Sequence, residues 1–473
     1  MSASDLVALR ESGQLSASEM VSHFLTRIEA LNGSINALVT VTPEQALERA
    51  SAMDEGLLNP GMLWGLPFAD KDLTNRAGVV TGAGSRTNLG APPSLVSDPI
   101  ALVLDAAGGI SVGKSAVCEF GLTSYTESLV FPPTRNPYDL SIGSGGSSGG
   151  AAAAVAGRIL PAAPGSDGGG SVRIPSWICG LVGMKPSRGA IPAGTGFKSL
   201  AGLVVPGPIA RTISDAALLL DAMRGEGPVN HASKNDFPNE KLASSLDTDV
   251  PPLRIGITIR HPWETVVETE LDPNAQRALN VVRSSLEKMG HNVEEIVWEP
   301  KFEYSDAFKK IWQASAAMLQ VSNKSLDLLE PFTRYLAESG AKLSATDLGI
   351  ALQALTQFEE HTITHFSPYN LIITPGLSTS PPIVGFYETD DPERNFEQQV
   401  MVTPYSSFVN VAGLPALALP VLRDSSGVPF GVQLIGRPGG DLTLLRVGKL
   451  LETWLDLATT FDTPAFSGPL PPG

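Results

Sequence analysis

The chain has 473 residues, of which 42% are apolar and 17% are charged, so it can bury a large core and is not disordered throughout. Its 47 glycines and 38 prolines are typical of a loop-rich globular protein and show no collagen period. The net charge of −16 argues against nucleic acid or an anionic membrane as the main partner.

The first sixty residues are predicted to be helical. Ser16 and Glu19 have capping-box spacing ahead of an apolar stripe at helical spacing, and Pro43 stands at the favoured first position of another helix. After Gly61, short apolar runs alternate with glycine-rich turns. We expect strands at 66–70, 110–113 and 159–163, and helices at 99–107 and 151–156.

The second half of the chain continues this alternation. Asp272 can cap a helix over 273–289, which Gly290 ends. Residues 301–365 are mostly helical in character. Further strands are expected at 253–259, 293–298, 371–374, 414–420 and 428–435. The alternation predicts an α/β fold, with helices on both faces of a sheet.

Two segments combine glycine and serine: Gly143–Gly150 and Gly165–Pro175. Glycines around serines let backbone amides converge on an anion. In the second segment three glycines lead directly into Ser171, which suits a nucleophile whose preceding amides form an oxyanion hole. The alternatives are a flexible linker for the first segment and a phosphate-cradling loop for the second, although neither has the Gly-Lys-Ser/Thr ending of a P-loop.

A serine nucleophile needs a base. None of the six histidines lies in a motif-like context, and the i, i+4 pair His361 and His365 has no evident third metal ligand. Lys71 ends an apolar strand. A lysine there forms an ordinary ion pair or, if it is desolvated, acquires a lowered pKa and acts as a base. Strand alternation predicts that the neighbouring Asp70 points away from Lys71.

An ordered set of motifs spread over nearly the whole chain resembles the amidase signature family of serine hydrolases. The motifs are Lys71-Asp72, Gly145–Gly150, Gly165–Pro175 and Cys179–Gly189, supported by Asn410–Pro420 and Pro429–Arg437. The resemblance implies an α/β fold with a large mixed, mostly parallel twisted sheet. It implies a single domain over 1–473, with N-terminal helices at 1–60, the signature core at 61–215 and a variable, largely helical substrate-side region at 300–386.

The resemblance also assigns roles to individual residues. Ser171 is the expected nucleophile, Ser147 is the serine that follows a cis peptide bond, and Lys71 is the base. The backbone amides of Gly168, Gly169 and Gly170 are expected to form the oxyanion hole. Ser148, Asp167 and Arg173 are the expected supporting residues. Gly168 stands where the family often has isoleucine or threonine, which predicts a wider pocket beside the nucleophile.

The implied activity is hydrolysis of a carboxamide or N-substituted amide to an acid and an amine or ammonia. It proceeds through an acyl-enzyme on Ser171, needs no metal or cofactor, and is chemically open to esters and carbamates. One alternative is the glutaminase subunit of an amidotransferase. Another is a catalytically inactive binding protein, against which the intact set of Lys71, Ser147 and Ser171 argues.

The expected partner is a small-molecule amide, with a homodimer suggested by the family and neither nucleic acid nor a membrane involved. Two cysteines, Cys118 and Cys179, are too few for a disulfide framework. There is no recognisable signal peptide and no apolar run approaching about 18 residues. Together with the low cysteine content, this favours a cytoplasmic protein.

The sequence leaves the identity of the substrate open. The region at 300–386 offers several aromatic residues, each of which is more often part of a core: Phe302, Tyr304, Phe308, Trp312, Phe332, Tyr335, Phe358 and Phe386.

Overall fold

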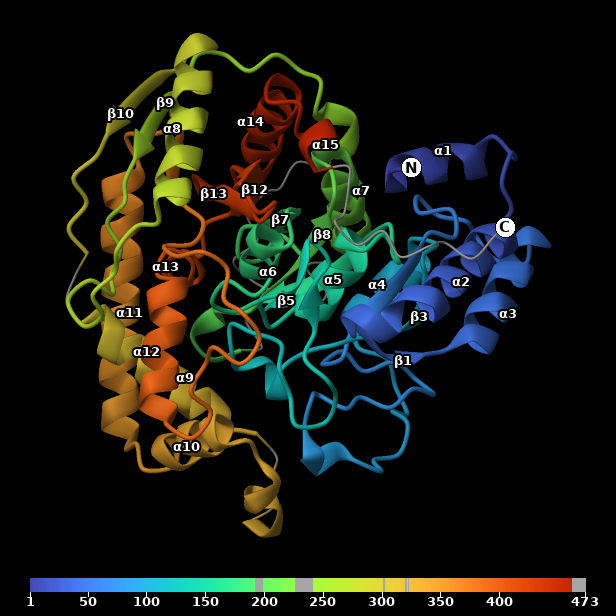
Figure 1. The fold of residues 1–473 in the computed structure, drawn as a ribbon, viewed down its shortest axis with the longest axis horizontal. Helices are drawn as coiled ribbons and strands as arrows, with labels where there is room; N and C mark the ends of the chain where they lie inside the picture. The colour runs from blue at the N-terminus through green and yellow to red at the C-terminus, as the bar shows by residue number, and fades with distance from the viewer. Residues whose placement is uncertain (192–198, 226–240, 301–302, 320, 322, 462–473) are drawn as a thin grey trace.

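The centre of the molecule is an eight-stranded sheet (Figure 1). The computed structural model describes residues 1–191, 199–225, 241–300, 303–319, 321 and 323–461. The strand order is β10-β9-β11-β13-β12-β7-β8-β6. In chain order these strands are β6 (Ala162–Asp167), β7 (Val182–Lys185), β8 (Val205–Ala210), β9 (Arg254–Ile257), β10 (Asn292–Glu295), β11 (Leu371–Pro375), β12 (Ala416–Arg423) and β13 (Pro429–Gly436).

The sheet is mixed, as predicted, but the expectation that it is mostly parallel is wrong. Only β10–β9 and β9–β11 pair in parallel, and the other five pairings are antiparallel. One physical reason lies in the connections. The turn between β12 and β13 is too short for a crossover, so these strands form a hairpin.

One predicted strand is shifted along the chain, and two strands of the sheet were not predicted. The strand expected at 159–163 is shifted to β6, because the polar Gly165, Ser166 and Asp167 pair with β8 while Ile159 lies in a turn. β7 and β8 were not predicted. The sequence of β8 contains Pro206 and Pro208, which oppose a central strand. Both prolines pair with β6 only, because β7 pairs with just the last two residues of β8.

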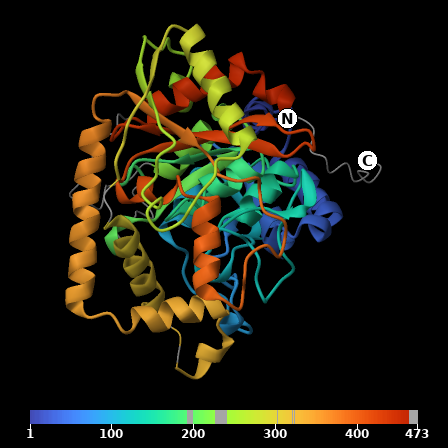
Figure 2. The same ribbon diagram turned by 60° about the vertical axis from the view of Figure 1, so that its left-hand side comes forward.

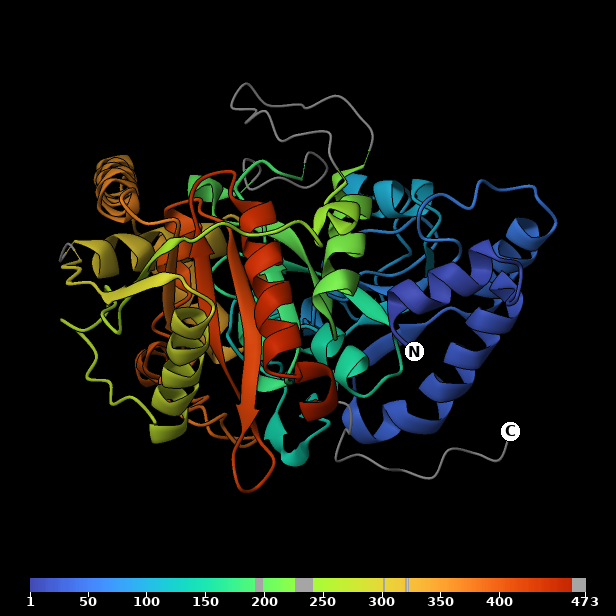
Figure 3. The same cartoon turned by 90° about the horizontal axis from the view of Figure 1, so that it is seen from above.

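Helices cover both faces of this sheet (Figure 3). On the upper face of Figure 1 lie α7 (Ile213–Arg224), α8 (Pro273–Lys288) and α14 (Asp441–Trp454), followed by α15 (Leu457–Thr460). Below it, α6 (Arg173–Ile178) packs on β7, β12 and β13, with α13 (Ser407–Val411) nearby. α5 (Gly149–Ala156) packs on β6 and β8 and is wholly buried, since its small side chains allow close approach.

A three-stranded sheet with its own helices carries the N-terminal part. Its order is β1-β3-β2, and its strands are β1 (Leu38–Val41), β2 (Pro67–Lys71) and β3 (Ile110–Ser115). The helices are α1 (Ala3–Glu11), α2 (Ala17–Ile35), α3 (Pro43–Asp54) and α4 (Pro99–Ala106). The capping box of Ser16 and Glu19 opens α2 as predicted, whereas β1 interrupts the predicted helices and pairs with β3. A short hairpin of β4 (Arg135–Asn136) and β5 (Asp139–Gly143) precedes α5.

The region after β10 forms a helical flank beside the sheet (Figure 2). It contains α9 (Tyr304–Ala317), α10 (Pro331–Gly340), α11 (Ala345–Phe366) and, after β11, α12 (Pro392–Val402). The helical character predicted for 301–365 is confirmed, although Lys301 and Phe302 lie outside the described residues. No helix in the described part of the chain has both the length and the apolarity needed to cross a membrane.

Trp177 on α6 joins the two halves of the core, and its loss tests this packing. The side chain is fully buried, its Nε1 donates to the backbone oxygen of Val432 at 2.9 Å, and its ring lies where a Cβ on Gly376 would stand. Trp177→Ala should lower the free energy of unfolding by about 3–5 kcal/mol, measured by urea denaturation. Trp454→Ala, at a side chain that is 54% exposed, is the control and should change it by no more than about 0.5 kcal/mol. Equal effects of the two changes would contradict this view of the core.

Candidate active site

Lys71 is the last residue of β2 and is almost completely buried, with 3% of its surface exposed. Its Nζ lies 2.8 Å from Ser147 Oγ, 3.1 Å from Ser166 Oγ and 3.2 Å from the backbone oxygen of Ser166. Burial disfavours the charged form and lowers the pKa of Lys71 to about 8, against the weaker opposing influence of Cys118 and Asp167. A large fraction of this amine is therefore neutral near pH 8.

Asp70 points away from Lys71, as strand alternation predicts. Its carboxylate accepts hydrogen bonds from Arg76 Nε at 2.6 Å and Ser111 Oγ at 2.8 Å, and Arg76 continues to Asp105. This charge is thus paired on the other side of β2. Asp70 therefore places no carboxylate against the amine of Lys71.

Ser147 follows a cis peptide bond from Gly146. A Cβ at Gly146 would lie 2.6 Å from the backbone of Tyr125, so only glycine fits there. Ser148 next to it connects the two glycine-serine segments. Its backbone amide donates to the oxygen of Ser171 at 3.3 Å, and its Oγ lies 3.4 Å from the backbone amide and oxygen of Ser166. Ser147 and Ser171 are therefore held on adjoining segments, beside Lys71.

The loop from Gly168 to Ser171 leaves β6 and enters α6. Ser406 Oγ donates to the backbone oxygen of Gly169 at 2.6 Å and holds this loop against α13. The amide of Gly170 donates to Asp167 Oδ1 at 2.8 Å, so it is committed to the protein. For the amides of Gly168 and Gly169, no acceptor is found within the described chain, and these two remain able to donate to a bound oxyanion.

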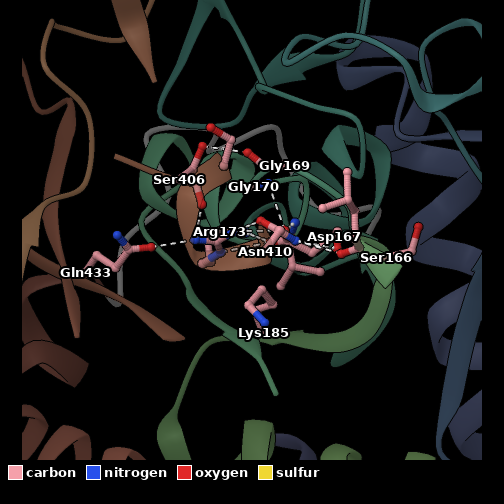
Figure 4. Close-up of polar contacts among 12 residues, drawn as sticks. Ser166, Asp167, Gly169, Gly170, Arg173, Lys185, Ser406, Asn410 and Gln433 are labelled. Carbon is pink, nitrogen blue, oxygen red and sulfur yellow. Dashed lines mark hydrogen bonds and ion pairs between the residues drawn. The ribbon is translucent and has the colours of Figure 1, made fainter. Parts of the chain in front are cut away.

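Below this loop lies a buried ion pair between Asp167 and Arg173, both 0% exposed (Figure 4). Arg173 donates through Nε and Nη2 to the two carboxylate oxygens at 3.0 and 2.9 Å. Burial alone would raise the pKa of Asp167, but the charge and hydrogen bonds of Arg173 hold it well below its usual value. The pair is bidentate, and the Asp167 carboxylate is ionised near neutral pH.

Arg173 also connects the loop before Ser171 to α13 and to β13 (Figure 4). Its guanidinium donates to Asn410 Oδ1 on α13 at 2.6 Å, to Gln433 Oε1 on β13 at 2.6 Å and to the backbone oxygen of Ser406 at 2.9 Å. Asn410 Nδ2 in turn donates to Asp167 Oδ1 at 2.9 Å. The loop before Ser171 is thus fastened to the sheet through side chains.

Lys185 on β7 lies beside this network (Figure 4). It is 1% exposed, and its Nζ donates to the backbone oxygen of Pro186 at 2.9 Å. Burial, and then the positive charge of Arg173, lower the pKa of Lys185 to about 7. Near neutral pH the lysine can lose its proton, which avoids a second full positive charge next to Arg173.

The structure brings several of the residues that the sequence singled out into contact, but the amide of Gly170, expected in the oxyanion hole, donates to Asp167 instead. Lys71 contacts Ser147, Ser148 contacts the segment of Ser171, and Asp167 pairs with Arg173. Sequence reasoning assigned no role to Ser166, Ser406, Asn410 and Gln433. Asn410 and Gln433 lie in the stretches quoted as supporting motifs, which was the available signal, but only their contacts with Arg173 reveal a role.

A cavity with about 540 Å³ of empty space, part of it open to solvent, lies next to Ser171. Its described walls include Gly169 and Ser171 and a group of aromatic side chains: Trp263, Phe308, Trp312, Phe332 and Phe396. Ser171 itself is 8% exposed. A substrate entering the cavity would therefore meet Ser171 at its inner end.

Histidines are absent from the described walls of this cavity. His361 and His365 lie together on α11, and His361 Nε2 is 3.2 Å from the backbone oxygen of Glu299. Across the described residues there is no group of three or more histidine, cysteine or acidic side chains arranged to hold a metal ion.

The chain is similar to known amide-cleaving proteins over nearly all of its length. The family model described as Amidase matches residues 19–445. A putative amidase AmiB2 of Mycobacterium tuberculosis is 33% identical over 449 residues, which is 93% of each protein. A glutamyl-tRNA(Gln) amidotransferase subunit from Picosynechococcus is 33% identical over 92% of this chain and 94% of its own. The solved structure of 6-aminohexanoate cyclic dimer hydrolase superimposes with a TM-score of 0.87 at 26% identity, covering 96% of this chain and 97% of the other.

The Asp167–Arg173 pair offers a test of how the loop is held. Arg173→Met leaves the Asp167 carboxylate buried without its partner and should lower the free energy of unfolding by about 3–5 kcal/mol. The double change Asp167→Asn with Arg173→Met removes both charges and should be less destabilised than the sum of the two single changes. Urea denaturation of all four proteins measures this coupling. Strict additivity would show that the pair does not act as a unit.

Proposed function

The chain belongs to the amidase signature family and is a hydrolase of carbon–nitrogen bonds, and from that premise we propose that it cleaves amides through an acyl-enzyme on Ser171. The observation that carries the proposal is the 2.8 Å contact between the buried Lys71 Nζ and Ser147 Oγ, next to the segment that bears Ser171. A buried, partly neutral amine that is hydrogen-bonded to a hydroxyl can act as a general base at pH 7–8.

In the first half of the reaction, neutral Lys71 accepts the proton of Ser147 while Ser147 accepts the proton of Ser171. Ser171 Oγ then bonds to the amide carbon, and the carbonyl oxygen becomes an oxyanion. The amides of Gly168 and Gly169 donate to that oxygen. The carbon–nitrogen bond breaks as the proton returns through Ser147 to the leaving nitrogen, and Lys71 is neutral again.

In the second half, water attacks the ester that joins the acyl group to Ser171. Ser147 and Lys71 take up the proton of the water and return it to Ser171 Oγ as the carbon–oxygen bond breaks. The products are a carboxylic acid and an amine or ammonia. Asp167 and Arg173 act as positioning residues, because they hold the loop of Gly168 and Gly169 without touching the reacting atoms.

The glutaminase subunit remains the alternative, since amidotransferase subunits are among the relatives. Glutamine carries an α-ammonium and an α-carboxylate, which a binding site must neutralise to hold them out of water. None of the described residues that line the cavity at Ser171 is charged. This observation favours a stand-alone amide hydrolase.

Labelling with a fluorophosphonate tests the nucleophile. We expect one adduct, on Ser171, located by peptide mass spectrometry of the purified protein. Lys71→Ala should slow the labelling by at least about 100-fold because the relay loses its base. Ser4→Ala, at a hydroxyl outside the site that hydrogen-bonds to Asp215, is the matched control and should label normally. An adduct on another serine, or none on the folded protein, would contradict the proposal.

The pH dependence tests the base. Lys71 must be neutral to accept a proton, and its pKa of about 8 means that its neutral fraction grows as the pH rises. The kcat/KM for a neutral amide should therefore increase about tenfold per pH unit below pH 7 and level off above pH 9. The rate of fluorophosphonate labelling should follow the same curve. Lys71→Arg, which stays charged, should abolish both. A flat profile between pH 6 and 9 would exclude Lys71 as the base.

A further inference from the structure

The cavity beside Ser171 has aromatic walls that the reaction itself does not require. They come from four parts of the chain: Phe308 and Trp312 on α9, Phe332 on α10, Phe396 on α12 and Trp263 on the loop after β9. In Figure 2, α9 and α12 lie below the sheet, and α10 lies across their lower ends. We therefore expect these walls to determine which substrates the site binds.

Three aromatic rings of α9 form a ladder. Tyr304, Phe308 and Trp312 are spaced by four residues, so they lie on one face of the helix. The rings of Tyr304 and Phe308 are 5.8 Å apart at 20°, and those of Phe308 and Trp312 are 5.6 Å apart at 16°. Trp312 Nε1 donates to the backbone oxygen of Leu122 at 3.1 Å, which fixes the outer ring. The ladder thus presents flat, rigid surfaces to the cavity.

The ladder lies directly against the loop that precedes Ser171. A Cβ at Gly168 would be 3.4 Å from the Trp312 ring, and a Cβ at Gly169 would be 3.6 Å from Phe308 Cζ. Both distances are ordinary van der Waals contacts, so the two rings lie immediately beside the loop that precedes Ser171. A group bound against the rings would be adjacent to the carbon that Ser171 attacks.

The wall beside Phe308 is also aromatic and is fixed by hydrogen bonds. Trp263 packs edge-to-face on Phe308 at 5.6 Å and 84°, and on Phe396 at 5.8 Å. Ser407 Oγ accepts from Trp263 Nε1 at 3.1 Å and from the Tyr304 hydroxyl at 2.7 Å. A flat group in the cavity could stack on one of the lining rings and meet the edge of another, which are the favoured aromatic geometries.

Three of the hydroxyl groups around the cavity direct their hydrogens into the protein. Thr123 Oγ1 donates to the oxygen of Tyr125 at 2.9 Å, Thr403 Oγ1 donates to the oxygen of Gln399 at 2.8 Å, and Ser406 Oγ is bound to Gly169. With no charge among the described lining residues, the cavity offers apolar surface to most of a ligand. It therefore favours an uncharged group over a zwitterion.

The position of the relay indicates which side of the amide enters. The leaving nitrogen takes its proton from Ser147, so it must lie beside Ser147. Neither Ser147 nor Lys71 belongs to the cavity wall, whereas Gly169 and Ser171 do. We propose that the cavity is an acyl pocket that takes an uncharged, flat aryl-substituted acyl group, stacked against Phe308 and Trp312. The proposal rests on the function proposed above.

Primary amides test the acyl group alone, because ammonia is the leaving group in every case. We expect kcat/KM for 3-phenylpropanamide to exceed that for propanamide by at least about tenfold, and that for glutamine to be lower than both. Release of ammonia is the measurement. Equal values for 3-phenylpropanamide and propanamide, or a preference for glutamine, would overturn the proposal.

Variants at the ladder test its location. Trp312→Ala should reduce the ratio of kcat/KM for 3-phenylpropanamide over propanamide by about tenfold, and Trp312→Phe, which keeps a ring, should retain most of it. Trp454→Ala, at an exposed tryptophan on α14, is the control and should leave the ratio unchanged. If Trp312→Ala leaves the ratio unchanged, the ring is not part of the acyl pocket.

An isomeric pair tests the side of the amide. N-benzylacetamide has the same composition as 3-phenylpropanamide but carries its ring on the nitrogen. Trp312→Ala should impair hydrolysis of 3-phenylpropanamide at least about fivefold more than that of N-benzylacetamide. The reverse order would place the leaving group in the cavity and overturn the acyl assignment.

Fluorophosphonate labelling separates this proposal from the one it rests on. Labelling of Ser171 without a preference for the aryl acyl group would overturn the pocket and leave the acyl-enzyme mechanism standing. No labelling of the folded protein would overturn both. Labelling of Ser171 together with the expected preference supports both.

Discussion

The buried ion pair of Asp167 and Arg173 is the interaction on which the rest of the site depends. Two unpaired charges at that depth would be strongly destabilising, so the geometry must be bidentate and every remaining donor must find an acceptor. Asn410 and Gln433 supply those acceptors from α13 and β13. Satisfying one guanidinium therefore fixes the position of the oxyanion loop relative to the sheet. Stability and preorganisation of the site arise here from the same hydrogen bonds.

Lys71, in contrast to Arg173, must lack a close counter-charge, because only then is its pKa low enough for it to accept a proton in the proposed reaction. Asp70 and Lys71 are neighbours in β2, yet the pleat sends the carboxylate to Arg76 on one side and the amine to Ser147 on the other. If both pointed the same way, an ion pair would raise the pKa of Lys71 and leave it protonated. One strand thus separates a paired structural charge from the proposed base.

The sequence was sufficient for the local features of the fold and for the residues with motif-like surroundings. The apolar run located Lys71 at the end of a strand, and the resemblance to the family predicted the cis bond before Ser147; the structure has both. It failed where long-range pairing decides. β8 carries prolines at positions that only its one-sided pairing with β6 tolerates. The direction of strand pairing likewise depends on connections that periodicity does not reveal. Gln433 was out of reach for the same reason, because its role exists only through a contact with a residue 260 positions away.

The aromatic residues of α9 show why a substrate pocket is harder to recognise than a catalytic residue. Tyr304, Phe308 and Trp312 have one spacing and one helix face, and the sequence pattern does not distinguish them. In the structure Tyr304 is core, whereas Phe308 and Trp312 reach the cavity. The difference comes from where the helix crosses the glycine loop. A Cβ at Gly168 would already be in van der Waals contact with the outer ring, so the branched side chains that the family often has at this position would compete with Trp312 for the same space.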